Sequence, residues 1–290
     1  MRPITLAALA LLFAGSPAVA EDAPGPNRPD EPAAPRLSLG RAADFLDAAS
    51  QSWTRNRKCT TCHTNVPYLV ARPLLGDSPA HREVRAFFED RAANWETNRP
   101  RWDAEVVVTA YALAGNDAHA AGKLHPMTRK ALDRMWALQR ADGAWDWLKC
   151  DWPPMEHDDY YGATLAALAA GLAPEGYAKT EPAREGIEKL RRYFRDTPAP
   201  DLHHRAMLLW ASTRIDGLMT DERKREVVRE LREKQRADGG WCLPSLGTYT
   251  RHDDTPNAPG APSDGYATGL AVFVLRQAGV PADDPALRKG

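Results

Sequence analysis

The residues best suited to chemistry are two closely spaced cysteines with a histidine directly after them. Cys59, Cys62 and His63 form a Cys-x-x-Cys-His motif within KCTTCHTNVPYLVARP, residues 58–73. In c-type haem attachment, the two thiols of such a motif add to the haem vinyl groups, and the histidine supplies an axial nitrogen to the iron. The motif therefore predicts one covalently bound haem c, with His63 as an iron ligand.

Other interpretations of the motif fit the rest of the sequence less well. A thioredoxin-like dithiol is expected in a βαβ context, and no part of this chain alternates strand and helix patterns. A structural zinc site needs a second ligand pair, whereas Cys150 and Cys242 are single and far apart in the chain. A disulfide between Cys59 and Cys62 would be strained by its short loop. Haem attachment is therefore the preferred hypothesis.

The N-terminus indicates the compartment in which the motif would act. Residues 1–20 combine a basic start, an uncharged apolar run and the small-x-small sequence Ala-Val-Ala, which is the pattern of a secretory signal peptide. Residues 21–37 are rich in proline, charge and small side chains, so we expect a disordered leader there. The sequence therefore predicts a secreted or periplasmic protein with one folded domain at 38–290.

Charge and hydropathy argue against two properties, the binding of nucleic acid and the spanning of a membrane. The formal net charge is −1, and the 38 basic and 39 acidic residues are interleaved along the chain. Because no basic stripe stands out, we expect no nucleic acid partner. No apolar run after the signal approaches the roughly 20 residues needed to cross a bilayer, so the mature chain is not expected to span a membrane.

A repeated string indicates how the chain is organised. LQRADGAWDW from Leu138 and KQRADGGWCL from Lys234 each end a charged amphipathic stretch and precede a polar loop and an Ala-rich apolar run. Helical periodicity predicts charged helices at 39–56, 79–96, 126–140, 183–195 and 220–236, and apolar helices at 63–76, 103–114, 160–172, 202–215 and 265–278. Because helices that are apolar on nearly all sides must be buried, an inner layer wrapped by an outer layer is expected.

The two copies of this string carry a resemblance to a known family. Gln139–Trp145 and Gln235–Trp241 resemble the Gln-Trp repeats of squalene cyclases and prenyltransferase β-subunits, and the likeness extends from about residue 79 onward. It implies an all-α fold, an α/α toroid of inner and outer helices; generic helical hairpins are the alternative. PADDPALRKG after Val280 has the start signals of a further outer helix, so we expect an incomplete ring and a chain truncated at its C-terminus.

In such a toroid the N-termini of the inner helices would gather at one end, together with the cysteine motif. Several polar residues are then expected to converge there: Asp103, Glu105, Glu156, His157, Asp158, Asp159, His203, His204, His252, Asp253, Asp254 and Asp264. Carboxylates at helix N-termini also serve as caps, so each one alone is explained structurally. The candidates for a distal haem ligand are His157 and Met155, followed by His203, His204 and His252.

Cys150 and Cys242 each follow one of the repeated Gly-Trp turns. In an oxidising compartment, a disulfide between these two loops is one expectation, and two buried free thiols are the alternative.

These observations favour an exported c-type haem protein that acts in electron transfer or haem-based redox chemistry with a redox partner protein. The resemblance to squalene cyclases implies a rival, an isoprenoid or lipid cyclase or transferase. Those cyclases carry an Asp-x-Asp-Asp acid motif at the start of an inner helix, and Glu156, Asp158 and Asp159 are similar in placement, with glutamate for the first aspartate. Burial that raised a carboxyl pKa would let such an acid protonate an alkene.

The match to the cyclases is incomplete, because no second helical barrel or membrane-facing apolar channel is evident. A non-catalytic toroid whose cavity holds a lipid or isoprenoid, a glycan or a partner is a further alternative, as is a separate cytochrome domain at 39–125. The sequence leaves open whether the protein is an enzyme.

Overall fold

The computed structural model describes residues 36–61, 63–98, 103–149, 154–248, 257–258 and 260–290. Within these ranges the secondary structure consists of helices, without a strand, which confirms the all-α prediction. The predicted signal peptide and nearly all of the predicted leader lie outside the described residues. No described helix combines the length and the apolar character that a membrane span requires.

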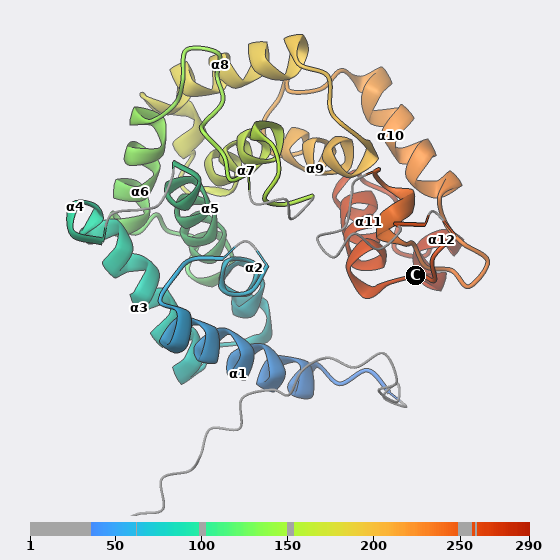
Figure 1. The fold of residues 1–290 in the computed structure, drawn as a ribbon, viewed down its shortest axis with the longest axis horizontal. Helices are drawn as coiled ribbons and strands as arrows, with labels where there is room; N and C mark the ends of the chain where they lie inside the picture. The colour runs from blue at the N-terminus through green and yellow to red at the C-terminus, as the bar shows by residue number, and fades with distance from the viewer. Residues whose placement is uncertain (1–35, 62, 99–102, 150–153, 249–256, 259) are drawn as a thin grey trace, which may run out of the picture.

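The helices form two layers that alternate along the chain (Figure 1). The outer helices are α1 (Leu39–Arg57), α3 (Pro79–Ala93), α6 (Pro126–Ala137), α8 (Ala183–Asp196) and α10 (Asp221–Glu233). The inner helices are α2 (Asn65–Ala71), α5 (Asp103–Ala120), α7 (Asp159–Leu172), α9 (Leu202–Ser212) and α11 (Gly265–Gln277). The inner helices pack side by side in this order, as expected for segments that are apolar on most sides.

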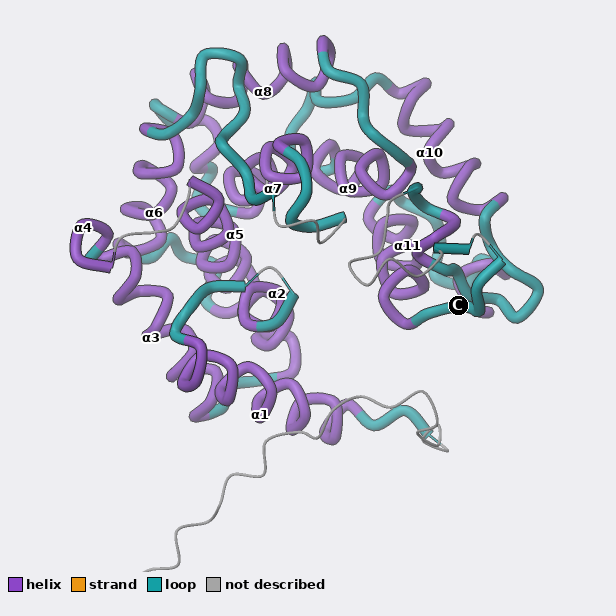
Figure 2. Tube along the Cα trace, in the orientation of Figure 1, coloured by secondary structure: helices purple, strands orange, loops and turns teal. Residues whose placement is uncertain are grey.

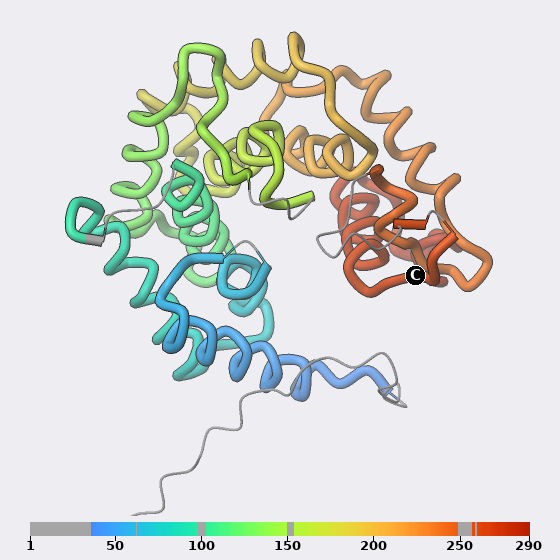
Figure 3. The backbone as a smooth tube through the Cα atoms, viewed as in Figure 1, coloured from blue at the N-terminus to red at the C-terminus, as the bar shows by residue number. Residues whose placement is uncertain are grey.

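The two layers follow an arc whose ends lie apart (Figure 3). Helices α1 and α2 lie at one end, and α11 with the short helix α12 (Pro285–Lys289) lies at the other. The connections include α4 (Trp95–Asn98) and the 3₁₀ turns η1 (Arg72–Leu75), η2 (Tyr177–Lys179) and η3 (Leu243–Ser245), and long loops join the layers (Figure 2). The predicted further outer helix after Val280 is present as α12.

Most helix boundaries agree with the sequence predictions, and α5 is the main exception. It continues to Ala120, past the predicted end at 114. Asn116 and Asp117 are buried there and hold their positions through long-range contacts. The Asn116 amide donates to the carbonyl of Leu69 in α2 at 2.8 Å, and Asp117 pairs with Arg85 in α3 at 2.7 Å. Tertiary contacts thus override the weak helix propensity of Gly-Asn-Asp.

The first Gln-Trp turn fastens two outer helices together. Gln139 Nε2 donates to the carbonyl oxygens of Gly143 within the turn, at 2.9 Å, and of Gly186 in α8, at 3.0 Å. The fully buried Trp145 donates from Nε1 to the carbonyl of Met135 in α6 at 2.7 Å. The turn therefore ties α6, which precedes it, to the next outer helix. The buried Trp145 ring thus serves in packing at this turn.

The second Gln-Trp turn makes the same contacts. Gln235 Nε2 donates to the carbonyl oxygens of Gly239, at 2.6 Å, and of Ala286 in α12, at 2.7 Å. Trp241 is fully buried and donates from Nε1 to the carbonyl of Leu231 in α10 at 2.6 Å. Because α12 occupies the place that α8 holds at the first turn, the last helix is equivalent to an outer helix.

Candidate functional site

The Cys-x-x-Cys-His segment lies on the loop between α1 and α2, and the buried Asn65 shapes this loop. The Asn65 side-chain oxygen accepts from the Thr61 backbone N–H at 2.9 Å. Its Nδ2 donates to the Cys59 carbonyl at 3.0 Å and to the Thr54 hydroxyl at 3.2 Å. One amide thus joins the end of α1, the motif and the start of α2. Sequence reasoning missed this residue, which looks like an ordinary helix-start asparagine.

The motif residues lie at the surface of this loop. The Cys59 thiol is free and half-buried, and His63 is exposed, whereas Cys62 lies outside the described residues. The His63 ring packs edge-to-face on Trp53 of α1, with ring centroids 5.1 Å apart. His63 Nδ1 lies 2.9 Å from the Thr64 hydroxyl. Among the described residues, no hydrogen-bond partner is found for His63 Nε2.

Glu156, which stands between Met155 and His157 in the sequence, interacts electrostatically with His63 of the motif. Although His63 is at the surface, partial desolvation lowers its pKa, and the Glu156 carboxylate acts to raise it. This interaction is electrostatic and links two loops that are far apart in sequence. Trp147 donates from Nε1 to the Met155 carbonyl at 2.8 Å and anchors the segment. His157 is exposed, and Met155 is partly buried against the core.

A second polar cluster surrounds His204, which is almost fully buried at the start of α9. His204 Nδ1 lies 2.7 Å from Asp201 Oδ1, and His204 Nε2 lies 2.9 Å from Asp158 Oδ2. The second pair is close enough for an ion pair but is not aligned as a hydrogen bond. Burial disfavours the charged ring, but the two carboxylates outweigh burial and raise the pKa of His204 to about 9.

His203, which is fully buried, lies beside this cluster. Its ring stacks between Tyr161 of α7 and Tyr266 of α11, with centroid separations of 6.0 and 5.9 Å. His203 Nε2 lies 2.7 Å from the Tyr266 hydroxyl, while the buried Nδ1 has no hydrogen-bond partner among the described residues. Burial, reinforced by the charge on His204, lowers the pKa of His203 to about 3. His203 is therefore neutral and has one uncommitted ring nitrogen.

These positions narrow the set of distal-ligand candidates. The predicted distal ligands His203 and His204 are both buried in the α7–α9–α11 packing, where Tyr266, Asp158 and Asp201 contact them. Their role as distal ligands stays a prediction. His252, Asp253 and Asp254 lie outside the described residues. Met155 and His157 remain as the candidates next to the motif.

Two of the other predicted carboxylates, Asp264 and Glu105, have identifiable structural partners. Asp264 caps α11, where Oδ1 accepts from the Ala267 N–H at 2.7 Å and Oδ2 accepts from the Leu243 N–H at 2.6 Å. Glu105 pairs with Arg91. Desolvation, followed by the charge of nearby Asp146, raises the pKa of Asp103.

The acid cluster of the cyclase alternative departs from the expected electrostatics. Burial alone would raise the pKa of Asp158, as that alternative requires. The contact with His204 and the Tyr161 backbone N–H outweigh burial and leave the pKa of Asp158 below its usual value. Asp159 pairs with Arg140 at 2.8 Å and with Lys149 at 3.3 Å. The expectation of a raised pKa is therefore wrong for Asp158.

Cys242 is buried just after the second repeated tryptophan, and Arg236 Nη1 lies 3.8 Å from its sulfur. Cys150 and the nearby Trp152 lie outside the described residues. The disulfide between Cys150 and Cys242 therefore stays a prediction.

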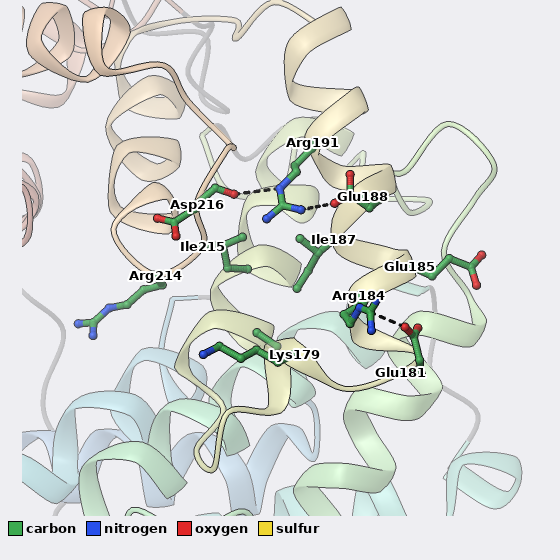
Figure 4. Close-up of a pocket in the computed structure, with 11 residues that line it drawn as sticks. Lys179, Glu181, Arg184, Glu185, Ile187, Glu188, Arg191, Arg214, Ile215 and Asp216 are labelled. Carbon is green, nitrogen blue, oxygen red and sulfur yellow. Dashed lines mark hydrogen bonds and ion pairs between the residues drawn. The ribbon is translucent and has the colours of Figure 1, made fainter.

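A cavity of about 640 Å³ lies in the outer layer and contains none of the residues predicted from the sequence (Figure 4). Its walls come from α8, η2 and the loop after α9, and acidic and basic side chains alternate along them. Arg191 donates to the Asp216 carbonyl at 2.9 Å and pairs with Glu188, while Arg184 pairs with Glu181 at 3.3 Å (Figure 4). Because these charges are largely paired, no one charge sign dominates the cavity.

No family model, curated protein or solved structure matches this chain in the three comparisons with known proteins.

Proposed function

We propose that this chain is an exported c-type haem protein that binds one haem covalently through Cys59 and Cys62, with His63 as an axial ligand. The observation that carries the proposal is the loop fixed by Asn65, which presents a half-buried Cys59 thiol and an exposed His63 ring. The described donor groups of the motif therefore fit a haem by type and accessibility. Bound there, the haem would supply a one-electron redox centre.

The surroundings of His63 support a role as a ligand. An iron-bound imidazole needs one free ring nitrogen, and its other nitrogen is usually oriented by a hydrogen bond from outside the coordination sphere. Here the Thr64 hydroxyl lies 2.9 Å from Nδ1, which leaves Nε2 as the coordinating atom. Trp53 restricts the ring through their edge-to-face contact at 5.1 Å. The protein thus fixes the orientation of the histidine.

The segment bearing Met155 and His157 provides the candidates for the sixth ligand. The Glu156 carboxylate acts on the pKa of His63, and Met155 and His157 are its neighbours in sequence. A thioether ligand would raise the reduction potential relative to an imidazole. We therefore assign the distal position to this segment, with electron transfer to a partner protein or redox chemistry at the haem as the resulting activity.

We further propose that the two-layered arc is an incomplete α/α toroid of the squalene cyclase type. The two Gln-Trp turns make equivalent hydrogen bonds, and these support the assignment. In each turn the glutamine bonds to the following outer helix and the tryptophan to the preceding one. The cyclase activity itself has less support, because Asp158 is held in its ionised form by His204 rather than as a protonated acid. A cavity that binds a lipid or isoprenoid is compatible with the haem proposal.

The test is expression of the full chain with its signal peptide in a bacterium that carries a c-type maturation system. We expect signal removal, a denatured mass increased by one haem, and haem staining after denaturing electrophoresis. A Cys59→Ser/Cys62→Ser double variant should lose both haem signals, whereas Cys242→Ser, which changes a cysteine outside the motif, should keep them. An exported wild-type chain with an unmodified mass would refute the proposal. In the haem-loaded protein, Met155→Ala or His157→Ala should change the Soret band if that residue is the sixth ligand.

A further inference from the structure

The start of α9 carries a cluster of potential metal ligands that has no role in the haem proposal. Asp201, His203 and His204 each place a potential ligand atom within 4.8 Å of the others. All three come from the first turn of α9 and its cap, so one short segment fixes their spacing. We propose that these residues form a second, separate metal site for a divalent transition-metal ion such as Zn²⁺.

The uncommitted nitrogen of His203 is the observation that points to a ligand. His203 is fully buried, and its Nδ1 has no hydrogen-bond partner in the part of the chain that the structure describes, although leaving such an atom unsatisfied in a protein interior is unfavourable. A metal ion at this nitrogen would remove that cost. The capping role of Asp201 explains the position of the carboxylate, but it does not explain a buried imidazole with a free lone pair.

The outer partner of His203 has the arrangement found around protein metal ions, and a carboxylate lies at the corresponding nitrogen of His204. A metal-bound histidine usually has its second ring nitrogen held by a carboxylate or another polar group. The Tyr266 hydroxyl lies 2.7 Å from His203 Nε2, and Asp158 Oδ2 lies 2.9 Å from His204 Nε2. The Nδ1 atoms are then the nitrogens that face the ion. Coordination by His204 Nδ1 would displace the proton shared with Asp201 to solvent.

Charge and ligand type select the class of ion. Two carboxylates, Asp158 and Asp201, flank His204, and a dication would balance them. Two imidazole nitrogens and a carboxylate oxygen suit zinc and its neighbours better than calcium or magnesium, which prefer all-oxygen sites. Three protein ligands would leave a fourth position of a tetrahedral ion for water or substrate.

The carboxylate end of the cluster offers a route for the ion. Asp201 lines a cavity of about 450 Å³ between the α8–α9 loop and α10. Its side chain is 13% exposed, whereas that of His204 is only 3% exposed. Zinc can therefore reach the carboxylate from solvent before it contacts the buried rings.

Titration calorimetry of the full mature chain with Zn²⁺ after chelator treatment tests the proposal. It should be done in the Cys59→Ser/Cys62→Ser background, so that thiols of the motif cannot bind the metal. We expect one zinc per chain. Tyr266→Phe, which removes the hydroxyl that orients His203, should weaken binding by roughly 10–100-fold, and His203→Gln should weaken it further. His125→Gln, a control at an exposed histidine outside the cluster, should leave the affinity unchanged.

Two results would overturn the proposal: no zinc binding in this background, or zinc binding unaffected by the two cluster variants. Circular dichroism shows whether each variant folds. If His203→Gln does not fold, Tyr266→Phe decides, because its partly exposed ring keeps its shape. Since the background cannot attach haem through these cysteines, the outcome does not depend on the haem proposal.

Discussion

Asn65 connects the end of α1, the cysteine motif and the start of α2, so replacing it with alanine should loosen all three at once. The change removes the hydrogen bonds with the Thr61 N–H, the Cys59 carbonyl and the Thr54 hydroxyl. Each is worth about 1 kcal/mol net, and partners left buried add to the loss. We expect Asn65→Ala to lower the free energy of unfolding by about 2–4 kcal/mol.

The loss should be visible locally as well as globally. The Val66 amide, which donates to the Thr61 carbonyl at 3.2 Å, reports on opening of the motif loop. A local loss of about 3 kcal/mol corresponds to roughly 100-fold faster hydrogen exchange through such openings. Urea denaturation gives the global value, and exchange measured by mass spectrometry on the peptide around residues 59–66 gives the local one.

Asn56→Ala is the matched control, because Asn56 is also an asparagine near this loop. Its amide makes one exposed contact with the Ser52 hydroxyl, at 3.3 Å. Exposed substitutions of this kind usually change stability by no more than about 0.5 kcal/mol. If Asn65→Ala were as mild as Asn56→Ala in both measurements, Asn65 would not be the residue that fixes the motif loop.

Two further predictions concern the framework around the sites. Asp47 pairs with the buried Arg72 at 2.6 Å and accepts a hydrogen bond from the Tyr68 hydroxyl at 2.6 Å. Burial raises the pKa of Asp47, but its polar contacts, led by that with Arg72, together outweigh burial and lower it. Its contribution to stability is then present above about pH 4 and is lost as pH falls through the lowered pKa, so the roughly 2–3 kcal/mol cost of Asp47→Asn at pH 7 should shrink in acid denaturation series. At the second Gln-Trp turn, Gly239 has φ +95°, and an added Cβ would lie 2.6 Å from the Lys289 carbonyl. Gly239→Ala should lower the melting temperature through a loss of about 2–4 kcal/mol, whereas Gly269→Ala, in open space on α11, should be neutral or slightly stabilising; equal effects would contradict this account.

The helices were predictable because their hydrophobic periodicity is strong. The predicted range 183–195 matches α8 within one residue, and Pro126 marks the start of α6 as expected. What could not be predicted depends on contacts between distant segments. Asn116 extends α5 because it reaches the Leu69 carbonyl, and no local pattern contains that information. The burial of His203 likewise requires tyrosines from α7 and α11, which lie far from it in sequence.

Three of the inner helices begin with the same aspartate cap, and one of these caps belongs to the candidate metal site. Asp158, Asp201 and Asp264 cap α7, α9 and α11 in the same way, each accepting from the backbone N–H three residues later, at 3.0, 2.9 and 2.7 Å. Sequence reasoning identifies such caps and assigns each a structural role.

The difference arises at the residue three positions after the cap. This residue is Tyr161 in α7 and Ala267 in α11, whereas in α9 it is His204. The two ring nitrogens of His204 lie close to two carboxylates, that of its own cap and that of the cap of the neighbouring helix α7. Packing α7 against α9 brings the second carboxylate into range. The repeated capping aspartates therefore form a polar cluster only in α9, where a histidine stands three residues after the cap. The residues of this cluster are brought together by helix packing and do not come from any single segment.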